Sequence, residues 1–209
     1  MTRKSIALRS RGFADAVERK GPVYRLIIIL PIPLAFLIAL WSEPISGSLW
    51  RGGILLLLGE LLRIWSAGYL SGFHLSLQES KPVTWGPYGL VRNPGSWGTF
   101  LLGLGVTVMS AWWPAYVLLI CMVVIGTRYV IPVEETLLQM QFGEAYTVYR
   151  QAVPSYLPGW RNFLRWLKEG RGVREHAHRF RGREAWRAEG STLMFLVGVI
   201  AAMVIQWLF

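Results

Sequence analysis

Residues Pro94–Ile131, PGSWGTFLLGLGVTVMSAWWPAYVLLICMVVIGTRYVI, decide the fold class of this chain. The run is almost uniformly apolar, and it is long enough for two helices that each cross a bilayer, since one crossing takes about 20 residues. The segment 111–114, AWWP, interrupts the run with a proline and two tryptophans, which suit a turn at a membrane interface. We therefore expect a tight helical hairpin across a membrane.

The composition agrees with a multi-pass membrane protein. Hydrophobic residues make up 53% of the chain, and 11 are tryptophan. The 22 basic residues exceed the 12 acidic ones, but they cluster beside the apolar blocks, so we expect anionic lipid headgroups and not nucleic acid as partners.

The single Cys121 excludes a disulfide framework and is expected in core packing. His176 and His178 have no supporting carboxylate or cysteine pattern, so we expect no metal site.

Three further apolar blocks flank the hairpin and complete a prediction of five spans. They are Leu26–Trp41, Leu49–Phe73 and Thr192–Phe209. The expected fold is all-α, a multi-pass integral membrane helical bundle with five transmembrane helices and a cytosolic amphipathic helix. We divide the chain into a basic cytosolic arm (1–25), a membrane core (26–158) and a basic segment with an additional transmembrane helix (159–209). That last helix is expected either to pack in the same monomer or to support a homo-oligomer.

Charge asymmetry predicts the orientation. The arm 1–25, the loop 72–93 and the region 128–190 fall on one side of a five-span bundle and hold nearly all basic residues outside the apolar blocks. By the positive-inside rule these segments face the cytosol, and the C-terminus faces the opposite side.

Two groups of charged residues have both a structural and a functional interpretation. Glu60 and Arg63 lie three residues apart within the second apolar block, so they form a structural pair or line a site. Glu134 and Glu135 follow Pro132, which can open a helix, and acids in a first turn commonly complement the helix dipole. The stripe beyond them predicts an amphipathic helix that lies on the membrane or caps the bundle. It consists of Leu138, Phe142, Tyr146, Tyr149 and Val153.

The segment 85–98, WGPYGLVRNPGSWG, is a polar island between two spans. Asn93 is a favoured N-cap, Pro94 suits the first helical position, and Arg92 lies just outside. A helix that begins there directs backbone N–H groups and its positive dipole end at a bound anion, such as the carboxylate or phosphate of a soluble cofactor. The alternative is that Gly-Pro-Tyr and Asn-Pro are turn signals only.

The island and the acidic pair together resemble the isoprenylcysteine carboxyl methyltransferase family and its phospholipid methyltransferase relatives. The resemblance rests on GPYGLVRNPGSWG at 86–98, EETLL about 35 residues later, and FGEAYTVY at 142–149, followed by Val153 and Pro158. It covers roughly residues 49–158. It implies S-adenosylmethionine as methyl donor, a cytosolic cofactor pocket and a lipophilic acceptor that enters from the bilayer.

The resemblance assigns site residues by position in the motifs. Arg92 and Glu135 are the catalytic candidates. The cofactor-binding candidates are Tyr88, Gly89, Leu90, Val91, Arg92, Asn93, Pro94, Ser96, Gly98, Glu134 and Glu135. The chain departs from the family at Asn93, where a histidine is usual, and at Ser96, where a tyrosine is usual. These departures disfavour proton transfer at both positions, and the segment 160–209 lies outside the family core.

The acceptor stays open at this stage. A carboxylate is nucleophilic without a base and needs a cation such as Arg92 to hold it, whereas a protonated amine must lose a proton to a carboxylate or water. Glu134, Glu135 or Glu60 could take that proton. By resemblance an isoprenylcysteine-type carboxylate is the lead acceptor, a phospholipid amine is the alternative, and a small thiol is a third. A non-catalytic scaffold that binds anionic lipid or a protein partner is the alternative from another class.

Overall fold

The computed structural model describes residues 30–74, 81–168 and 180–209, and every regular element among them is helical. The expected all-α class is therefore confirmed. The elements are α2 (Pro31–Leu40), α3 (Ser46–His74), η1 (Gly86–Gly89), α4 (Pro94–Ser110), α5 (Pro114–Ile125), η2 (Gly126–Val130), α6 (Ile131–Phe142), α7 (Glu144–Ala152), α8 (Trp160–Lys168) and α9 (Gly182–Leu208).

Three helical stretches in the described ranges are long and apolar enough to cross a membrane, which supports an integral membrane protein. They are Ser46–Leu70, Pro114–Phe142 and Gly182–Leu208. The other two expected spans are represented by shorter helices, since α2 has 10 residues and α4 has 17. The block expected at Leu26–Trp41 begins outside the described residues.

The hairpin predicted around residues 111–114 is present. Helix α4 ends at Ser110, Ala111 turns the chain in the left-handed conformation with φ of 50°, and α5 starts at Pro114. The backbone N–H of Trp112 donates to Oγ of Ser110 at 3.3 Å and so closes the turn. Cys121, expected in core packing, is instead exposed on α5, as suits an outward-facing position on a membrane-spanning helix.

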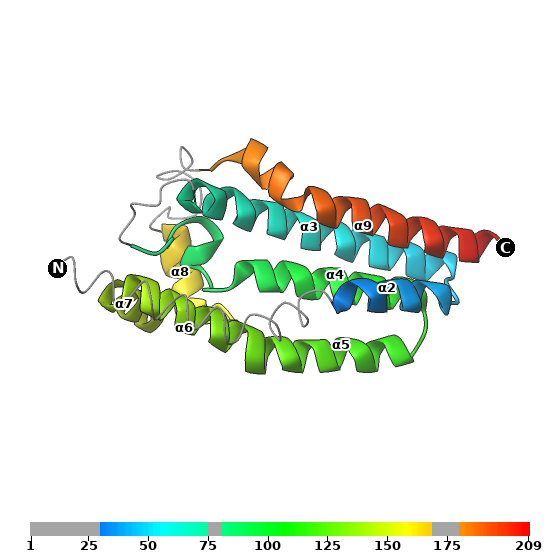
Figure 1. Ribbon diagram of the computed structural model, residues 1–209, viewed down its shortest axis with the longest axis horizontal. Helices are drawn as coiled ribbons and strands as arrows, with labels where there is room; N and C mark the ends of the chain where they lie inside the picture. Colours follow the sequence, from blue (N-terminus) through cyan, green and yellow to red (C-terminus); the bar gives the residue numbers. More distant parts are fainter. Residues whose placement is uncertain (1–29, 75–80, 169–179) are drawn as a thin grey trace.

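The core forms where α3 packs between α4 and α9. Helices α3 and α4 approach each other through glycines, with Gly52 facing Gly105 and Gly59 facing Gly98, so their backbones come unusually close. Helix α9 runs along α3, and α2 lies against α9 and α4 at one end (Figure 1). The last apolar helix thus packs within the same chain, which was one of its two expected arrangements.

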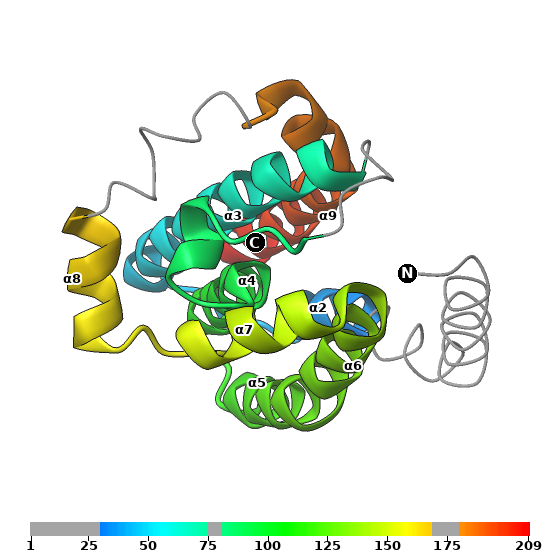
Figure 2. The same ribbon diagram turned by 90° about the vertical axis from the view of Figure 1, so that its left-hand side faces the viewer.

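The two ends of the bundle carry different elements. Element η1, helices α7 and α8, and the start of α9 gather at one end, whereas the α4–α5 turn and Phe209 lie at the other (Figure 1). Figure 2 looks at the first end along the bundle and shows α7 crossing it. The island and the C-terminus therefore lie at opposite ends of the bundle.

The amphipathic stripe is buried and not spread on a surface. Gly143, with φ of 59°, breaks the expected single helix into α6 and α7 and folds the stripe onto itself. Phe142, Tyr146 and Tyr149 form a buried cluster that Leu138 and Val153 pack against. Of the two predicted uses of this stripe, the capping of the bundle is the one that the packing favours.

Candidate functional site

The polar island folds as one helical turn followed by a helix start. Gly86, with φ of 62°, begins η1 against the ring of Tyr69, where a Cβ would lie 2.5 Å from a ring carbon. The N–H groups of Leu90 and Val91 donate to the carbonyl of Pro87, and α4 then starts at Pro94 as the sequence predicts. Arg92 lies between these two elements, at the end of the bundle.

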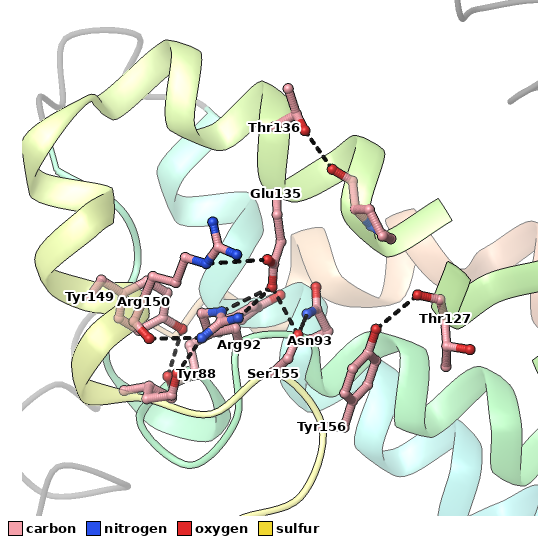
Figure 3. A network of polar contacts seen from close by, with 12 residues as sticks. Tyr88, Arg92, Asn93, Thr127, Glu135, Thr136, Tyr149, Arg150, Ser155 and Tyr156 are labelled. Atoms are coloured by element: carbon pink, nitrogen blue, oxygen red, sulfur yellow. Dashed lines mark hydrogen bonds and ion pairs between the residues drawn. The ribbon is translucent and has the colours of Figure 1, made fainter. Parts of the chain in front are cut away.

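Arg92 and Glu135 form the centre of a buried polar network (Figure 3). Nη2 and Nε of Arg92 both donate to Oε1 of Glu135, at 2.7 and 3.0 Å, and the two side chains are only 9% and 11% exposed. Nη1 of Arg92 donates to the carbonyls of Arg150 and Val153. One guanidinium therefore joins the island, α6 and the end of α7.

The network places the acidic pair beside the island, which favours a functional interpretation of these acids over a purely structural one. The remaining carboxylate oxygen of Glu135, Oε2, lies 3.8 Å from Nε of Arg150, whose side chain is exposed. Glu134 is half-buried one residue earlier, and its charge acts on the hydroxyl of Tyr88. Both acids thus face the island, and neither is merely a partner for the dipole of its own helix.

Asn93 does not cap α4 with its side chain, contrary to our prediction. It occupies the N-cap position, but Nδ2 donates to Oγ of Ser155 at 3.1 Å. Ser155 in turn donates to Oε1 of Glu135 at 2.8 Å. The Asn93 amide therefore does not cap α4, because it bonds to Ser155 instead. Through Ser155 it forms a second link between the island and Glu135, beside the Arg92–Glu135 pair.

Three tyrosines surround the Arg92–Glu135 pair, and each is held in its neutral form. Burial, followed by the charge of Glu135, raises the pKa of Tyr146 to about 12. The pKa of Tyr149 is raised by burial and by its neighbours Tyr88 and Tyr146, and its hydroxyl donates to the carbonyl of Tyr88 at 2.8 Å. Burial and the charges of Glu134 and Glu189 raise the pKa of Tyr88.

The buried Tyr146 hydroxyl is a donor without an acceptor in the described part of the chain. Its side chain is fully enclosed, with the residue only 1% exposed. A buried donor without an acceptor is costly, and the neighbouring Arg92 can only donate, so such a group commonly marks a place for a bound molecule or water. This hydroxyl lies within the electrostatic reach of both Arg92 and Glu135.

The other assigned residues occupy the walls of this region. Val91 and Pro94 are buried, Gly89, Leu90 and Ser96 are half-buried, and Gly98 is buried against α3. A Cβ on Gly98 would lie 2.5 Å from Cγ of Arg63 and 2.8 Å from the carbonyl of Gly59. Gly98 thus sets the distance between α3 and α4 directly below the island.

A linker that our sequence analysis did not assign completes the site. Residues 153–159 connect α7 to α8, and the carbonyl of Pro154 accepts from the N–H of Arg92 at 2.9 Å. The carbonyl of Tyr156 accepts from Nε1 of Trp97. The sequence signals were Val153 and Pro158, which the resemblance includes, and the Pro-Ser-Tyr segment at 154–156, which is typical of an ordinary turn.

The hydroxyl of Tyr156 holds the helix that carries the acidic pair. The backbone N–H of Ile131 donates to the carbonyl of Gly126, five residues earlier, as in a π-helix. The next hydrogen bond of this kind would run from the N–H of residue 132 to the carbonyl of Thr127. Residue 132 is a proline without an N–H, and the Tyr156 hydroxyl donates to that carbonyl at 3.0 Å instead. Pro132 stands in the first turn of α6, as the sequence predicts, but η2 runs directly into α6, so the helical stretch is continuous from Pro114.

A second charged cluster lies deeper in the bundle. Arg63 pairs with Glu189 of α9 at 2.6 Å and lies 3.9 Å from Glu60. It also donates to Oγ1 of Thr99 in α4 at 2.6 Å. The expected Glu60–Arg63 pair therefore exists, but its stronger partner is Glu189, a residue of the C-terminal segment.

The described residues contain no group of three His, Cys, Asp or Glu side chains arranged to hold a metal. His176 and His178 lie outside those residues.

Comparison with known families matches residues 48–145 to the family described as phospholipid methyltransferase. The matched range runs from the start of α3 to the start of α7, so it holds every assigned residue from Tyr88 to Glu135. Ser155, Tyr156 and Glu189 lie beyond it. The same comparisons found no match among curated proteins or solved structures.

Proposed function

We propose that the protein transfers a methyl group from S-adenosylmethionine to a lipophilic acceptor, because residues 48–145 match the family described as phospholipid methyltransferase. The single observation that carries the proposal is the buried pairing of Arg92 with Glu135, which joins the two family motifs into one polar site. A scaffold whose motifs had decayed would have no need to keep this pairing out of water.

The residues present fit S-adenosylmethionine in charge and hydrogen bonding. The start of α4 has no side-chain cap, and the Tyr146 hydroxyl has no acceptor in the described part of the chain, so both can donate to a carboxylate or a ribose oxygen. Oε2 of Glu135 and the Glu134 carboxylate can accept from an amino group or hydroxyls. When bound, the cofactor supplies an activated methyl group on a sulfonium.

The protein's own task is then to align the acceptor and to exclude water. Tyr88, Tyr146 and Tyr149 are neutral and enclosed, so they shield the site without adding charge. Transfer to an amine forms a carbon–nitrogen bond, breaks the carbon–sulfur bond and releases one proton. Either acid of the pair can take this proton, Glu134 through its carboxylate or Glu135 through Oε2, since it is Oε1 of Glu135 that accepts from Arg92 and Ser155.

The geometry favours an amine-bearing lipid as acceptor. A carboxylate acceptor would need Arg92 as its cation, but that guanidinium already donates to Glu135 and to two backbone carbonyls. An amine needs a nearby carboxylate, and two are present. The isoprenylcysteine-type carboxylate, which the motif resemblance puts first, is therefore the second candidate. A small thiol is a third.

Two measurements on the purified full-length protein test the proposal. Calorimetric titration in detergent should show binding of S-adenosylmethionine and of its demethylated product. Incubation with methyl-labelled S-adenosylmethionine in discs of phosphatidylethanolamine should then label the lipid, and a prenylcysteine in discs without amine lipid should be labelled more slowly. Labelling of the prenylcysteine alone would reverse the order of acceptors. Failure of both cofactor forms to bind would overturn the enzyme and favour the scaffold.

A further inference from the structure

Helix α8, Trp160–Lys168, is amphipathic, and both its basic face and its apolar face are exposed. Its basic residues Arg161, Arg165 and Lys168 follow at intervals of four and three, so they share one exposed face. The neighbouring face is apolar and also open, with Trp160 71% and Leu167 54% exposed. A helix with an open apolar face beside a basic face is typical of helices that lie in the interface of a membrane.

The orientation of α8 fits such an interface. In both views it lies across the direction of the long helices, at the end of the bundle that holds the island (Figures 1 and 2). Figure 2 shows it at the margin of the bundle, outside the ring of the other helices. If the long helices cross a bilayer, α8 runs parallel to the membrane plane.

The inward-facing Trp166 of α8 reaches the island itself. Nε1 of Trp166 donates to the carbonyl of Gly86 at 3.0 Å. The Trp166 ring packs so close to Gly89 that a Cβ at this position would lie 3.0 Å from a ring carbon. The ring also packs edge-on against Trp65 of α3. Helix α8 is also joined to the site through the linker 153–159, whose carbonyls accept from Arg92 and Trp97.

We propose that α8 is a docking surface for an anionic lipid bilayer, and that this docking holds η1 and the linker 153–159 in the arrangement that binds the cofactor. The second clause rests on the proposed function. Charge complementarity identifies the occupant, because three cations beside an apolar face suit acidic headgroups over acyl chains. A second copy of α8 would bring like charges together.

The docking is measured without the cofactor. In a protein with Cys121→Ser and Leu167→Cys, an environment-sensitive fluorophore at position 167 reports the polarity around α8. In nanodiscs with about 30% phosphatidylglycerol its emission should shift to the blue relative to discs of phosphatidylcholine alone. The triple variant Arg161→Gln, Arg165→Gln, Lys168→Gln should lose this shift. The matched variant Arg181→Gln, Arg183→Gln, Arg187→Gln, which removes the same charge from α9, should keep it.

The coupling is measured by calorimetric titration with S-adenosylmethionine in the same two kinds of disc. Affinity should be about fivefold higher with the anionic lipid, and Trp166→Phe should remove most of this difference while the blue shift is kept. Equal emission in the two discs, or equal loss of the shift in both triple variants, would overturn the docking. A normal shift with equal affinities would overturn the coupling. A normal shift without any cofactor binding would overturn the proposed function and leave the docking supported.

Discussion

The carboxylate of Glu189 in α9 lies 2.6 Å from Nη2 of Arg63 in α3, which joins the C-terminal helix by a charged contact to the residues that match the family. The same guanidinium reaches Thr99 in α4, so three helices meet at one side chain. Glu60 lies in the same cluster with both carboxylate oxygens buried and without a hydrogen bond in the described part of the chain. Arg63 is therefore the cation of a cluster that holds two acids.

Removal of the Glu189 carboxylate should destabilise the bundle. Glu189→Leu leaves Arg63 without its closest partner, and breaking a buried pair costs about 3 kcal/mol or more. We expect a lower midpoint of thermal unfolding in detergent, and partial recovery when Arg63→Met is added. Glu184→Gln, one and a half turns earlier on α9, is the control and should leave the midpoint nearly unchanged. An unchanged midpoint in Glu189→Leu would show that the Arg63–Glu189 contact does not stabilise the bundle.

The Arg92–Glu135 pair should behave as one unit. Arg92→Ala leaves a carboxylate that is 11% exposed without its main cation, and Glu135→Gln leaves Arg92 with an amide in place of a charge. Each change should weaken binding of S-adenosylmethionine, by about 1.5–3 kcal/mol for Arg92→Ala, and the double variant should lose less than the sum. Calorimetric titration measures this. Unchanged affinity in both single variants would show that the cofactor binds elsewhere.

The sequence predicted well those features that repeat along the chain or stand in a motif. The hairpin around Ala111 and the start of α4 at Pro94 follow from local rules on apolar length and proline. The meeting of Arg92 with Glu135 followed from two motifs in order. Contacts between residues far apart in the chain were not predicted, because no local pattern in the sequence indicates them. Examples are the hydrogen bond from Asn93 to Ser155 and the pairing of Arg63 with Glu189.

Gly98 shows how a motif residue can have a role that its motif does not state. It was assigned to cofactor binding, yet its missing side chain also lets α4 approach Gly59 and Arg63 of α3. Gly98→Ala should lower the thermal midpoint, since its Cβ would lie 2.8 Å from a backbone carbonyl that cannot move aside freely. Gly95→Ala in the same helix meets nothing within 4 Å and should leave stability unchanged or raise it by up to about 1 kcal/mol. Equal midpoints for the two variants would contradict this packing role.

The enclosed Tyr146 should make the protein sensitive to alkaline pH. Its pKa is raised from 10 to about 12 in the folded state, so the unfolded chain releases the phenol proton first as pH rises. Neutral Tyr146 therefore contributes about 2–3 kcal/mol to the free energy of unfolding below pH 10, and this contribution is lost between pH 10 and about 12. Tyr146→Phe should therefore lose less stability across that range than the parent protein. The exposed Tyr116→Phe is the control, and tyrosinate absorbance follows the titration.

Tyr156 and Pro132 allow a test in which one substitution should compensate for another. The Tyr156 hydroxyl donates to the carbonyl of Thr127, whose partner in the helix would be the N–H that proline lacks. Tyr156→Phe should leave that carbonyl unsatisfied and lower stability by about 1–3 kcal/mol. Pro132→Ala restores a backbone donor, so Tyr156→Phe should cost less in the Pro132→Ala protein than in the parent.

The exposed Tyr129→Phe, next to this bond on η2, controls for the loss of a hydroxyl as such. Thermal unfolding of the four proteins of the cycle, with and without S-adenosylmethionine, separates stability from function. Because α6 carries Glu134 and Glu135 just beyond Pro132, cofactor affinity should follow the same order as stability. Additive effects of the two substitutions would show that the Tyr156 hydroxyl does not replace the missing donor, and the acidic pair would then be positioned by the Arg92 network alone.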